Sequence, residues 1–475
     1  MKKVQLFKIL LIFFLIGDLT YSFLQYYHTP LFGDFEGGVL PSKHVQEIFN
    51  DPTGIKAIIT NEKHVNPNRF FSHFIFMEYF RSVPFFLQYF FEPIKSVYLS
   101  CALAKILVQV VIIYLLTTII SKEKNILNYK FLIIAALISP LFQTYGYWSR
   151  MGIIDKSTAY TFFYAVPISL LILFIKPLYS KLYNNDDKPF GKELFYLIPL
   201  VFILPFSGPL IPGIILIFSM LFFLYHIIEF KKHNNLSLIS VYSYLKVIPK
   251  NVLYIIIPVG FLSLYSLFLG NYDSNYGSES IPVIDRYLKL PVGILSQITH
   301  SLGFPLLLII IGINLLIINR KFKSIETEKI LKTLKWIGLF SVIYVLLLPL
   351  GGYRPYRPNI VRYDTILPVT ICLFLILGIT TYFLHGKMKS KKYWIFIIVS
   401  MLFYTFSDIS KLDENTCEIK ALNDISNSSD KIVVLSSDCN IMSWSKITDY
   451  KDSELKSELL QFWNITNEKK LFYQK

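Results

Sequence analysis

The chain has 475 residues, of which 53% are hydrophobic, 16% are aromatic and only 17% are charged. Soluble domains keep roughly a quarter of their residues charged, so this composition excludes an ordinary soluble protein and indicates a polytopic membrane protein. The net charge of +15 does not indicate nucleic-acid binding, because the lysines lie in short segments between apolar runs. The positive-inside rule accounts for charge of that kind.

The N-terminal sequence MKKVQLFKILLIFFLIGDLTYS has a basic start and an apolar core without a small-residue cleavage site, which predicts a retained anchor. Further apolar runs approach the roughly 20 residues that a helix needs to span a bilayer. The sequence therefore predicts an all-α polytopic membrane protein with about eleven transmembrane helices. The predicted spans are residues 5–24, 99–120, 130–146, 158–178, 194–207, 210–229, 252–270, 297–319, 335–350, 365–384 and 393–408.

Basic residues between the spans predict the orientation of the chain. The basic segments are 121–129, 179–193, 230–251, 320–334 and 385–392. With the N-terminus, they are expected in the cytoplasm. The segments then expected outside are 25–98, 147–157, 271–296, 351–364 and 409–475. The abundance of Lys, Ile and Asn is typical of an AT-rich bacterial genome, so we expect a bacterial inner membrane with a periplasmic C-terminus.

Two domains are predicted, a transmembrane domain over 1–408 and a small periplasmic domain over 409–475. The second domain is expected to be α/β, because KIVVLSS (431–437) is typical of a strand and DSELKSELLQFW (452–463) of a helix. Its two cysteines, Cys417 and Cys439, either pair in a disulfide, which an oxidising compartment would allow, or remain two thiols.

The long loop 25–98 opens with LFGDFEGG, which sets Asp34 and Glu36 two residues apart among glycines. Such carboxylates suit a general base or ligands for a hard divalent metal, although they are also ordinary residues of a solvated turn. The aromatic run at 68–93 is interrupted by polar residues and predicts one or two helices in the membrane interface, with an extra span as the alternative.

Two further outside loops carry charged residues. In YWSRMGIIDKS (147–157), Asp155 either lies beside Asp34 or caps the helix that follows, and Arg150 is also typical of a membrane boundary. In GGYRPYRPNIVRYD (351–364), the arginine density contradicts the positive-inside rule and predicts an anionic ligand, because arginine binds phosphate through two parallel hydrogen bonds. The arginines of this loop are Arg354, Arg357 and Arg362.

In layout, about the first 180 residues resemble the GT-C class of membrane glycosyltransferases, with a first helix, a long outside loop, an early acidic pair and interfacial helices. The segment SPLFQTYGYWSRMGIID (139–155) is similar to part of the catalytic subunits of oligosaccharyltransferases. The residues that carry this similarity are Pro140, Ser149, Arg150, Gly152 and Asp155. The sequence lacks a WWD-like motif for peptide recognition, so the resemblance favours a glycan acceptor.

The resemblance implies transfer of a sugar from a polyprenyl phosphate or diphosphate donor at the periplasmic face. Asp34 or Glu36 would activate the acceptor, and Asp34 and Asp155 would be the ligands if a divalent metal, Mg²⁺ or Mn²⁺, takes part. The donor phosphate would meet arginine side chains, for which the candidates are Arg150, Arg354, Arg357 and Arg362. The expected partners are the lipid-linked donor and membrane lipids.

Two other functions agree with the sequence. An envelope-glycan ligase or polymerase of O-antigen type, with an unrelated fold, would depend on the arginine loop and tolerate loss of Asp34. A transporter or flippase requires charged or helix-breaking positions at matching depth in both halves of the chain. The charged residues within predicted spans, Asp18 and Lys105, both lie in the first quarter, which disfavours a transporter.

Overall fold

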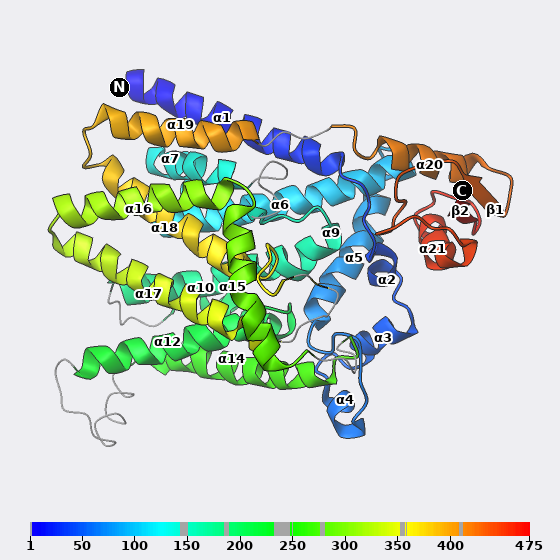
Figure 1. Ribbon diagram of the computed structural model, residues 1–475, viewed down its shortest axis with the longest axis horizontal. Coiled ribbons are helices and arrows are strands. Elements are labelled where there is room, and N and C mark those ends of the chain that lie inside the picture. The colour runs from blue at the N-terminus through cyan, green and yellow to red at the C-terminus, as the bar shows by residue number, and fades with distance from the viewer. Residues whose placement is uncertain are drawn as a thin grey trace.

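A computed structural model describes residues 2–142, 151–184, 190–231, 248, 250–275, 281–351, 357, 359–407 and 412–475. Across these residues, eight helical segments are long and apolar enough to cross a membrane. Most run roughly side by side, with the N-terminus at one end of the bundle and the C-terminus at the other (Figure 1). They are α1 (Lys2–Tyr27), α6 (Pro93–Ser121), α9 and α10 (Thr158–Tyr160 and Val166–Asn184, joined through a π-helical turn at Thr161–Ala165), α12 (Ile211–Lys231), α14 (Lys250–Leu269), α16 (Gly303–Lys321), α17 (Ile325–Leu347) and α18 (Leu367–His385).

The prediction of a helical membrane protein is confirmed at this level, but the count of eleven spans is not. The other three predicted spans form helices of 10, 10 and 17 residues, shorter than a bilayer normally requires. A short 3₁₀ turn that contains a proline follows each of the first two helices, because proline cannot continue the α-helical hydrogen bonds. These helices are α7 (Tyr129–Ile138), α11 (Leu194–Ile203) and α19 (Lys391–Ser407).

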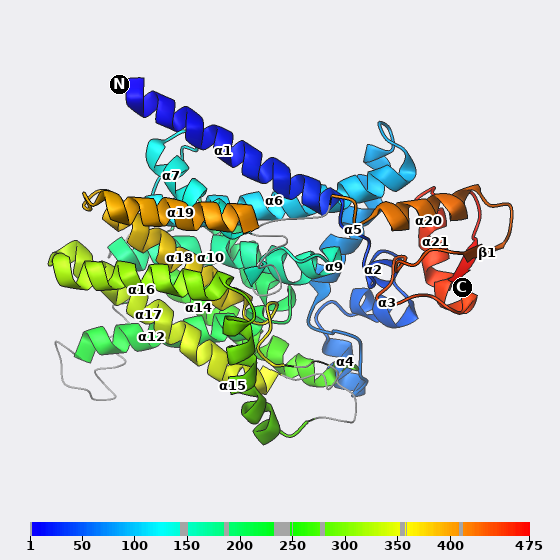
Figure 2. The ribbon, with the colours of Figure 1, turned by 45° about the horizontal axis from the view of Figure 1, so that its top comes forward.

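Helix α15 (Val283–Thr299) was not predicted. The sequence analysis expected a loop over 271–296 and a span from 297. The helix ends at Thr299, and the next span starts at Gly303. Its apolar and charged residues repeat at helical spacing, so the helix is amphipathic. Its mean hydropathy is too low for it to be predicted as a transmembrane helix. It crosses the spans at a steep angle (Figures 1 and 2), as expected of a helix lying along a membrane surface.

The first loop folds into four helices at the end of the bundle that carries the C-terminus (Figure 2). The interfacial segment forms one continuous helix, α5, even though Pro84 lies in its last turn. That helix also runs steeply across the spans (Figure 1). The four helices are α2 (Phe35–Val39), α3 (Lys43–Asn50), α4 (Ile55–Thr60) and α5 (Phe70–Leu87).

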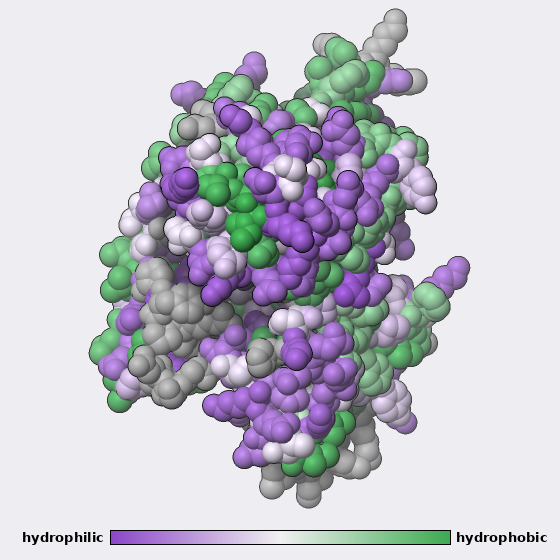
Figure 3. Space-filling view, turned by 90° about the vertical axis from the view of Figure 1, so that its right-hand side faces the viewer, coloured by the Kyte–Doolittle hydropathy of each residue, from purple (hydrophilic) through white to green (hydrophobic). Residues whose placement is uncertain are grey.

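The C-terminal domain contains the predicted strand and helix. Strands β1 (Ile432–Leu435) and β2 (Leu471–Gln474) pair in parallel, with helices α20 (Thr416–Asn427) and α21 (Glu454–Phe462) beside them. Cys417 and Cys439 form a disulfide, which answers the alternative that the sequence left open. The end of the molecule that this domain covers is largely hydrophilic (Figure 3).

One hydrophobic core joins the C-terminal domain to the first loop and to the start of α6. Trp463 is fully buried at its centre and donates from its indole nitrogen to the carbonyl of Phe80 in α5, over 3.0 Å. Phe35 of α2 packs edge-on against both of these rings. The C-terminal domain is therefore part of the framework that fixes the first loop.

Candidate functional site

A cavity of about 460 Å³ lies where the first loop meets the ends of the spans. Apolar side chains that line it include Leu210, just before α12, and Leu267 and Leu347 near the ends of α14 and α17. Polar and charged side chains from the first loop and the arginine loop line the same cavity. They include Asp34, Asn66, Arg69, His73, Arg357 and Arg362.

Asp34 reaches the cavity because its neighbours on both sides are buried. Leu31 and Phe35 are 2% and 1% exposed, and both pack in the core shared with the C-terminal domain. Asp34 itself precedes α2 in a left-handed conformation with φ of 74°, which aspartate tolerates better than most residues. The carboxylate is exposed at the cavity while its backbone is held from both sides.

The π-helical turn at Thr161–Ala165 supplies aromatic walls. Such turns are frequent at functional sites because they insert a residue into the helical repeat. Tyr160 and Tyr164 lie one turn apart, and both line the cavity. Gly208 packs closely against this turn, since a Cβ there would lie 2.7 Å from the carbonyl oxygen of Phe163.

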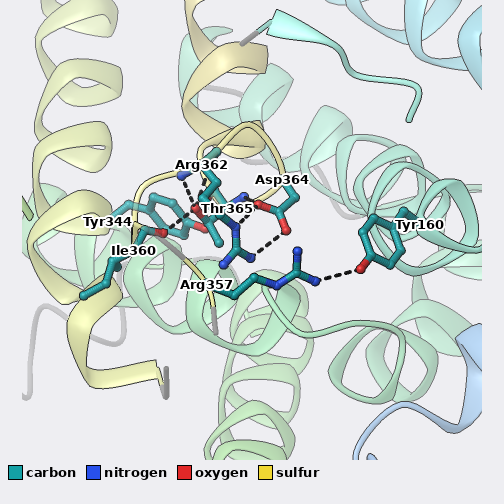
Figure 4. Close-up of polar contacts among 7 residues, drawn as sticks. All are labelled: Tyr160, Tyr344, Arg357, Ile360, Arg362, Asp364 and Thr365. Carbon is teal, nitrogen blue, oxygen red and sulfur yellow. Dashed lines mark hydrogen bonds and ion pairs between the residues drawn. The ribbon is translucent and has the colours of Figure 1, made fainter. Parts of the chain in front are cut away.

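The arginine loop brings two of its predicted residues into the cavity (Figure 4). Arg357 donates from Nη2 to the Tyr160 hydroxyl over 2.7 Å. Arg362 binds Asp364 through two hydrogen bonds, Nε to Oδ1 at 3.0 Å and Nη2 to Oδ2 at 2.7 Å. Burial alone would lower the pKa of Arg362, but the Asp364 carboxylate raises it, so the guanidinium stays charged.

The backbone of the arginine loop is held in place by hydrogen bonds to its own residues and to a span. Thr365 donates from its hydroxyl to the carbonyl of Ile360 over 2.8 Å. Tyr344 of α17 donates from its hydroxyl to the carbonyl of Thr365 over 2.7 Å (Figure 4). The guanidinium groups are therefore presented from a constrained turn.

Three cavity residues from the first loop were missed by the sequence analysis. Arg69 makes an ion pair with buried Asp273 at 3.8 Å, yet its Nε has no hydrogen-bond partner among the described residues. The same holds for the side-chain oxygen of Asn66 and for both ring nitrogens of His73, which is 6% exposed. Burial, followed by the charge of Arg69, lowers the pKa of His73 to about 3, so its ring is neutral. Their signal was the run NPNRFFSH (66–73), where polar residues precede and interrupt the aromatics.

Glu36, the alternative to Asp34, does not line the cavity. It forms an ion pair with Lys456 of α21 at 2.9 Å. Asp34 and Glu36 point apart because the helix that starts between them turns their side chains to different sides. Glu36 therefore ties the first loop to the C-terminal domain.

Asp155 does not line the cavity but contacts the arginine loop through Tyr363. It accepts a hydrogen bond from the backbone of Ser157 over 2.7 Å and one from the hydroxyl of Tyr363, the neighbour of Arg362. Burial raises the pKa of Asp155 to about 6, against the effect of these hydrogen bonds. Both alternatives of the sequence analysis miss this contact between the second loop and the arginine loop.

The predicted phosphate ligands Arg150 and Arg354 lie outside the described residues. Within the part of the chain that the structure describes, no three His, Cys, Asp or Glu side chains gather to hold a metal ion. Of the pair predicted as metal ligands, Asp34 lines the cavity and Asp155 does not. We derive no step through a metal.

Comparison with protein families, curated proteins and solved structures finds no match to this chain. Fold and site alone define its class. It is a multi-helix membrane protein with a cavity at one end of the bundle that is lined by apolar side chains and by arginine and aspartate.

Proposed function

We propose that the protein is an integral membrane glycosyltransferase that moves a sugar from a polyprenyl phosphate or diphosphate donor to an acceptor at the periplasmic face. One observation carries the proposal: Asp34 and Arg357, 323 positions apart in sequence, line one cavity together with apolar side chains near α12, α14 and α17. A donor with a charged head and an apolar tail fits such a cavity. The tail would lie among α12, α14 and α17.

The arginines supply the chemistry for a phosphate. Guanidinium groups bind phosphate oxygens through charge-assisted hydrogen bonds and offset the negative charge that grows as the leaving group departs. Arg69 and Arg362 are each paired with a carboxylate, which keeps them in position and charged. Arg357 donates to the Tyr160 hydroxyl over 2.7 Å and lines the same cavity as Arg69 and Arg362.

A sugar would satisfy the buried polar atoms near Arg69. An unpaired buried donor or acceptor costs roughly 1–3 kcal/mol, so a native site with several such atoms points to a polar ligand. His73 and Asn66 offer ring nitrogens and an amide oxygen, which suit sugar hydroxyls. Because His73 is neutral, it would act as a hydrogen-bonding group and leave proton transfer to Asp34.

The transfer step then uses Asp34 as the general base. Its carboxylate takes the proton from the acceptor hydroxyl while that oxygen attacks the anomeric carbon of the donor. The bond from the anomeric carbon to the phosphate oxygen breaks, and the phosphate leaves with the bonding electron pair toward the arginines. The products are a new glycosidic bond, a polyprenyl phosphate or diphosphate, and protonated Asp34.

The disulfide supports the proposed orientation. Disulfides persist in oxidising compartments such as the periplasm and are rare in the cytosol. Cys417 and Cys439 pair in the domain that packs on the first loop, at the same end of the bundle as the cavity. The N-terminus lies at the opposite end (Figure 2), as a cytoplasmic N-terminus would require.

The test is sugar transfer in membranes from a strain that lacks the chromosomal copy and expresses single variants. We expect Asp34→Asn and Arg357→Ala to abolish transfer with normal amounts of protein in the membrane. Glu36→Gln is the matched control, because it removes a carboxylate two residues away that does not line the cavity. Full activity in both Asp34→Asn and Arg357→Ala would end this assignment. Loss with Arg357→Ala alone would favour a ligase or polymerase.

A further inference from the structure

The C-terminal domain has two tryptophans in very different surroundings. Trp463 is fully buried, whereas Trp444 is 50% exposed. One face of Trp444 stacks on Phe32 of the first loop, with ring centres 5.4 Å apart and planes 23° apart.

Trp444 packs closely against the turn that contains Asp34, the proposed general base. A Cβ on Gly33 would lie 2.5 Å from Cδ1 of Trp444, so only glycine allows the indole to approach this closely. Asp34 is the next residue. The ring of Trp444 also lies near that of Tyr160, with ring centres 6.0 Å apart, and Tyr160 accepts the hydrogen bond from Arg357. The indole is therefore close to Gly33, which precedes Asp34, and to Tyr160, and both Asp34 and Tyr160 line the cavity.

The exposed half of the Trp444 indole is suited to a particular class of ligand. Aromatic faces carry partial negative charge, and the C–H bonds on one side of a pyranose ring carry partial positive charge. The two surfaces are flat and similar in size, so they stack while the sugar hydroxyls stay free at the ring edge. A sugar stacked on Trp444 would present such a hydroxyl toward Asp34.

We propose that Trp444, supported by Phe32, is a stacking platform for a pyranose ring of the acceptor, and that the acceptor is therefore a saccharide. This inference rests on the proposed glycosyl transfer and adds the class of its second substrate. It also gives the C-terminal domain a role in acceptor recognition. The competing role for Trp444 is that of an anchor in the membrane interface, where tryptophan is enriched.

Saturation-transfer NMR tests the platform with the full-length protein in nanodiscs free of sugar-based detergent. The aromatic protons of the protein are irradiated, and the C–H protons of chitotriose and maltotriose are observed. We expect saturation of the pyranose protons by the wild type, with binding weakened about tenfold in Trp444→Leu. Leucine keeps an apolar contact with Phe32 and removes the aromatic face. Trp444→Tyr should restore much of the signal.

Tyr89→Ala is the control, because Tyr89 is an aromatic residue that is 84% exposed on the turn after α5 and away from the cavity lining. It should bind the saccharides as the wild type does. An absence of saturation in the wild type for both saccharides, or equal binding by Trp444→Leu, would overturn the platform. An interface anchor alone would give the second result.

Sugar transfer, measured on the same variants, separates the two proposals. Saccharide binding through Trp444 without any transfer by the wild type would refute the glycosyltransferase and leave Trp444 as a saccharide-binding residue without an acceptor role. Transfer by the wild type onto a peptide or a lipid hydroxyl, found by linkage analysis of the product, would refute the platform and leave the glycosyltransferase standing.

Discussion

The hydroxyl of Tyr98 in α6 donates a hydrogen bond of 2.6 Å to the carboxylate of Glu418 in α20. The same carboxylate accepts from the backbone nitrogens of Leu31, at 2.7 Å, and Met442, at 2.8 Å. A single side chain, 1% exposed, thus connects a span, the C-terminal domain and the first loop just ahead of Asp34. The position of the proposed base depends on this junction.

Replacing Glu418 by glutamine should loosen the first loop. The amide offers one acceptor oxygen where the carboxylate offered two, so one buried donor loses its partner at a cost of roughly 1–3 kcal/mol. We expect a lower midpoint of thermal unfolding and faster proteolysis within residues 25–98. Asp424→Asn, an exposed position on the same helix, is the control. Unchanged proteolysis in Glu418→Gln would contradict the connecting role.

The stability of this junction should depend on pH. Burial raises the pKa of Glu418 to about 7, although the hydrogen bonds from Tyr98, Met442 and Leu31 act to lower it. An unfolded chain releases this proton near its ordinary pKa of 4.5, so between these values the folded state alone holds it. Stability should therefore fall as pH rises from about 5 to 7. Thermal unfolding across this range measures the effect, and Glu418→Gln should lose that slope. An increase in stability over the same window in the wild type would refute the prediction.

Asp155→Asn should reduce transfer less than Asp34→Asn does. Asp155 acts on the arginine loop through Tyr363, and asparagine keeps one oxygen that can accept a hydrogen bond. We expect a loss of about fivefold for Asp155→Asn, the equivalent of one buried hydrogen bond, against about a hundredfold or more for a general base. Donor affinity should weaken in Asp155→Asn, because the arginines move. Equal losses in both variants would show that Asp155 reacts directly.

The disulfide predicts how the cysteines respond to labelling. A maleimide that cannot cross membranes should modify Cys417 and Cys439 in intact spheroplasts only after reduction. The other two cysteines, Cys101 and Cys372, lie in spans and provide the unlabelled background. Labelling only after permeabilisation would place the C-terminal domain in the cytoplasm and remove the basis for a periplasmic active site. Cys417→Ser with Cys439→Ser should cost about 2–4 kcal/mol of stability.

Local patterns predicted much of the fold. The apolar runs marked the eight long helices because a span must bury its backbone hydrogen bonds within one continuous segment. The strand pattern at 431–437 and the helix pattern at 452–463 contain β1 and α21, because hydrophobic periodicity is a local signal. Helix α15 was not predicted because its charged residues and Pro291 lower its mean hydropathy, although the helix has an exposed apolar face.

Only part of the candidate site could be predicted from the sequence. Residue chemistry selected Asp34 and the arginines Arg357 and Arg362, which the structure brings to one cavity. It could not separate Asp34 from Glu36, because that choice depends on a five-residue helix and on a partner, Lys456, 420 positions away. It also missed the role of the C-terminal domain, whose contacts with the first loop are all long-range in sequence.

Binding of undecaprenyl phosphate tests the central claim most directly. The purified protein in nanodiscs is titrated with undecaprenyl phosphate and with undecaprenol, which has the same tail without the phosphate. We predict that the phosphate binds at least about tenfold more tightly than the alcohol, and that Arg357→Ala removes the difference. Equal binding of the two lipids by the wild type, or full phosphate preference in Arg357→Ala, would contradict a phosphate site in this cavity.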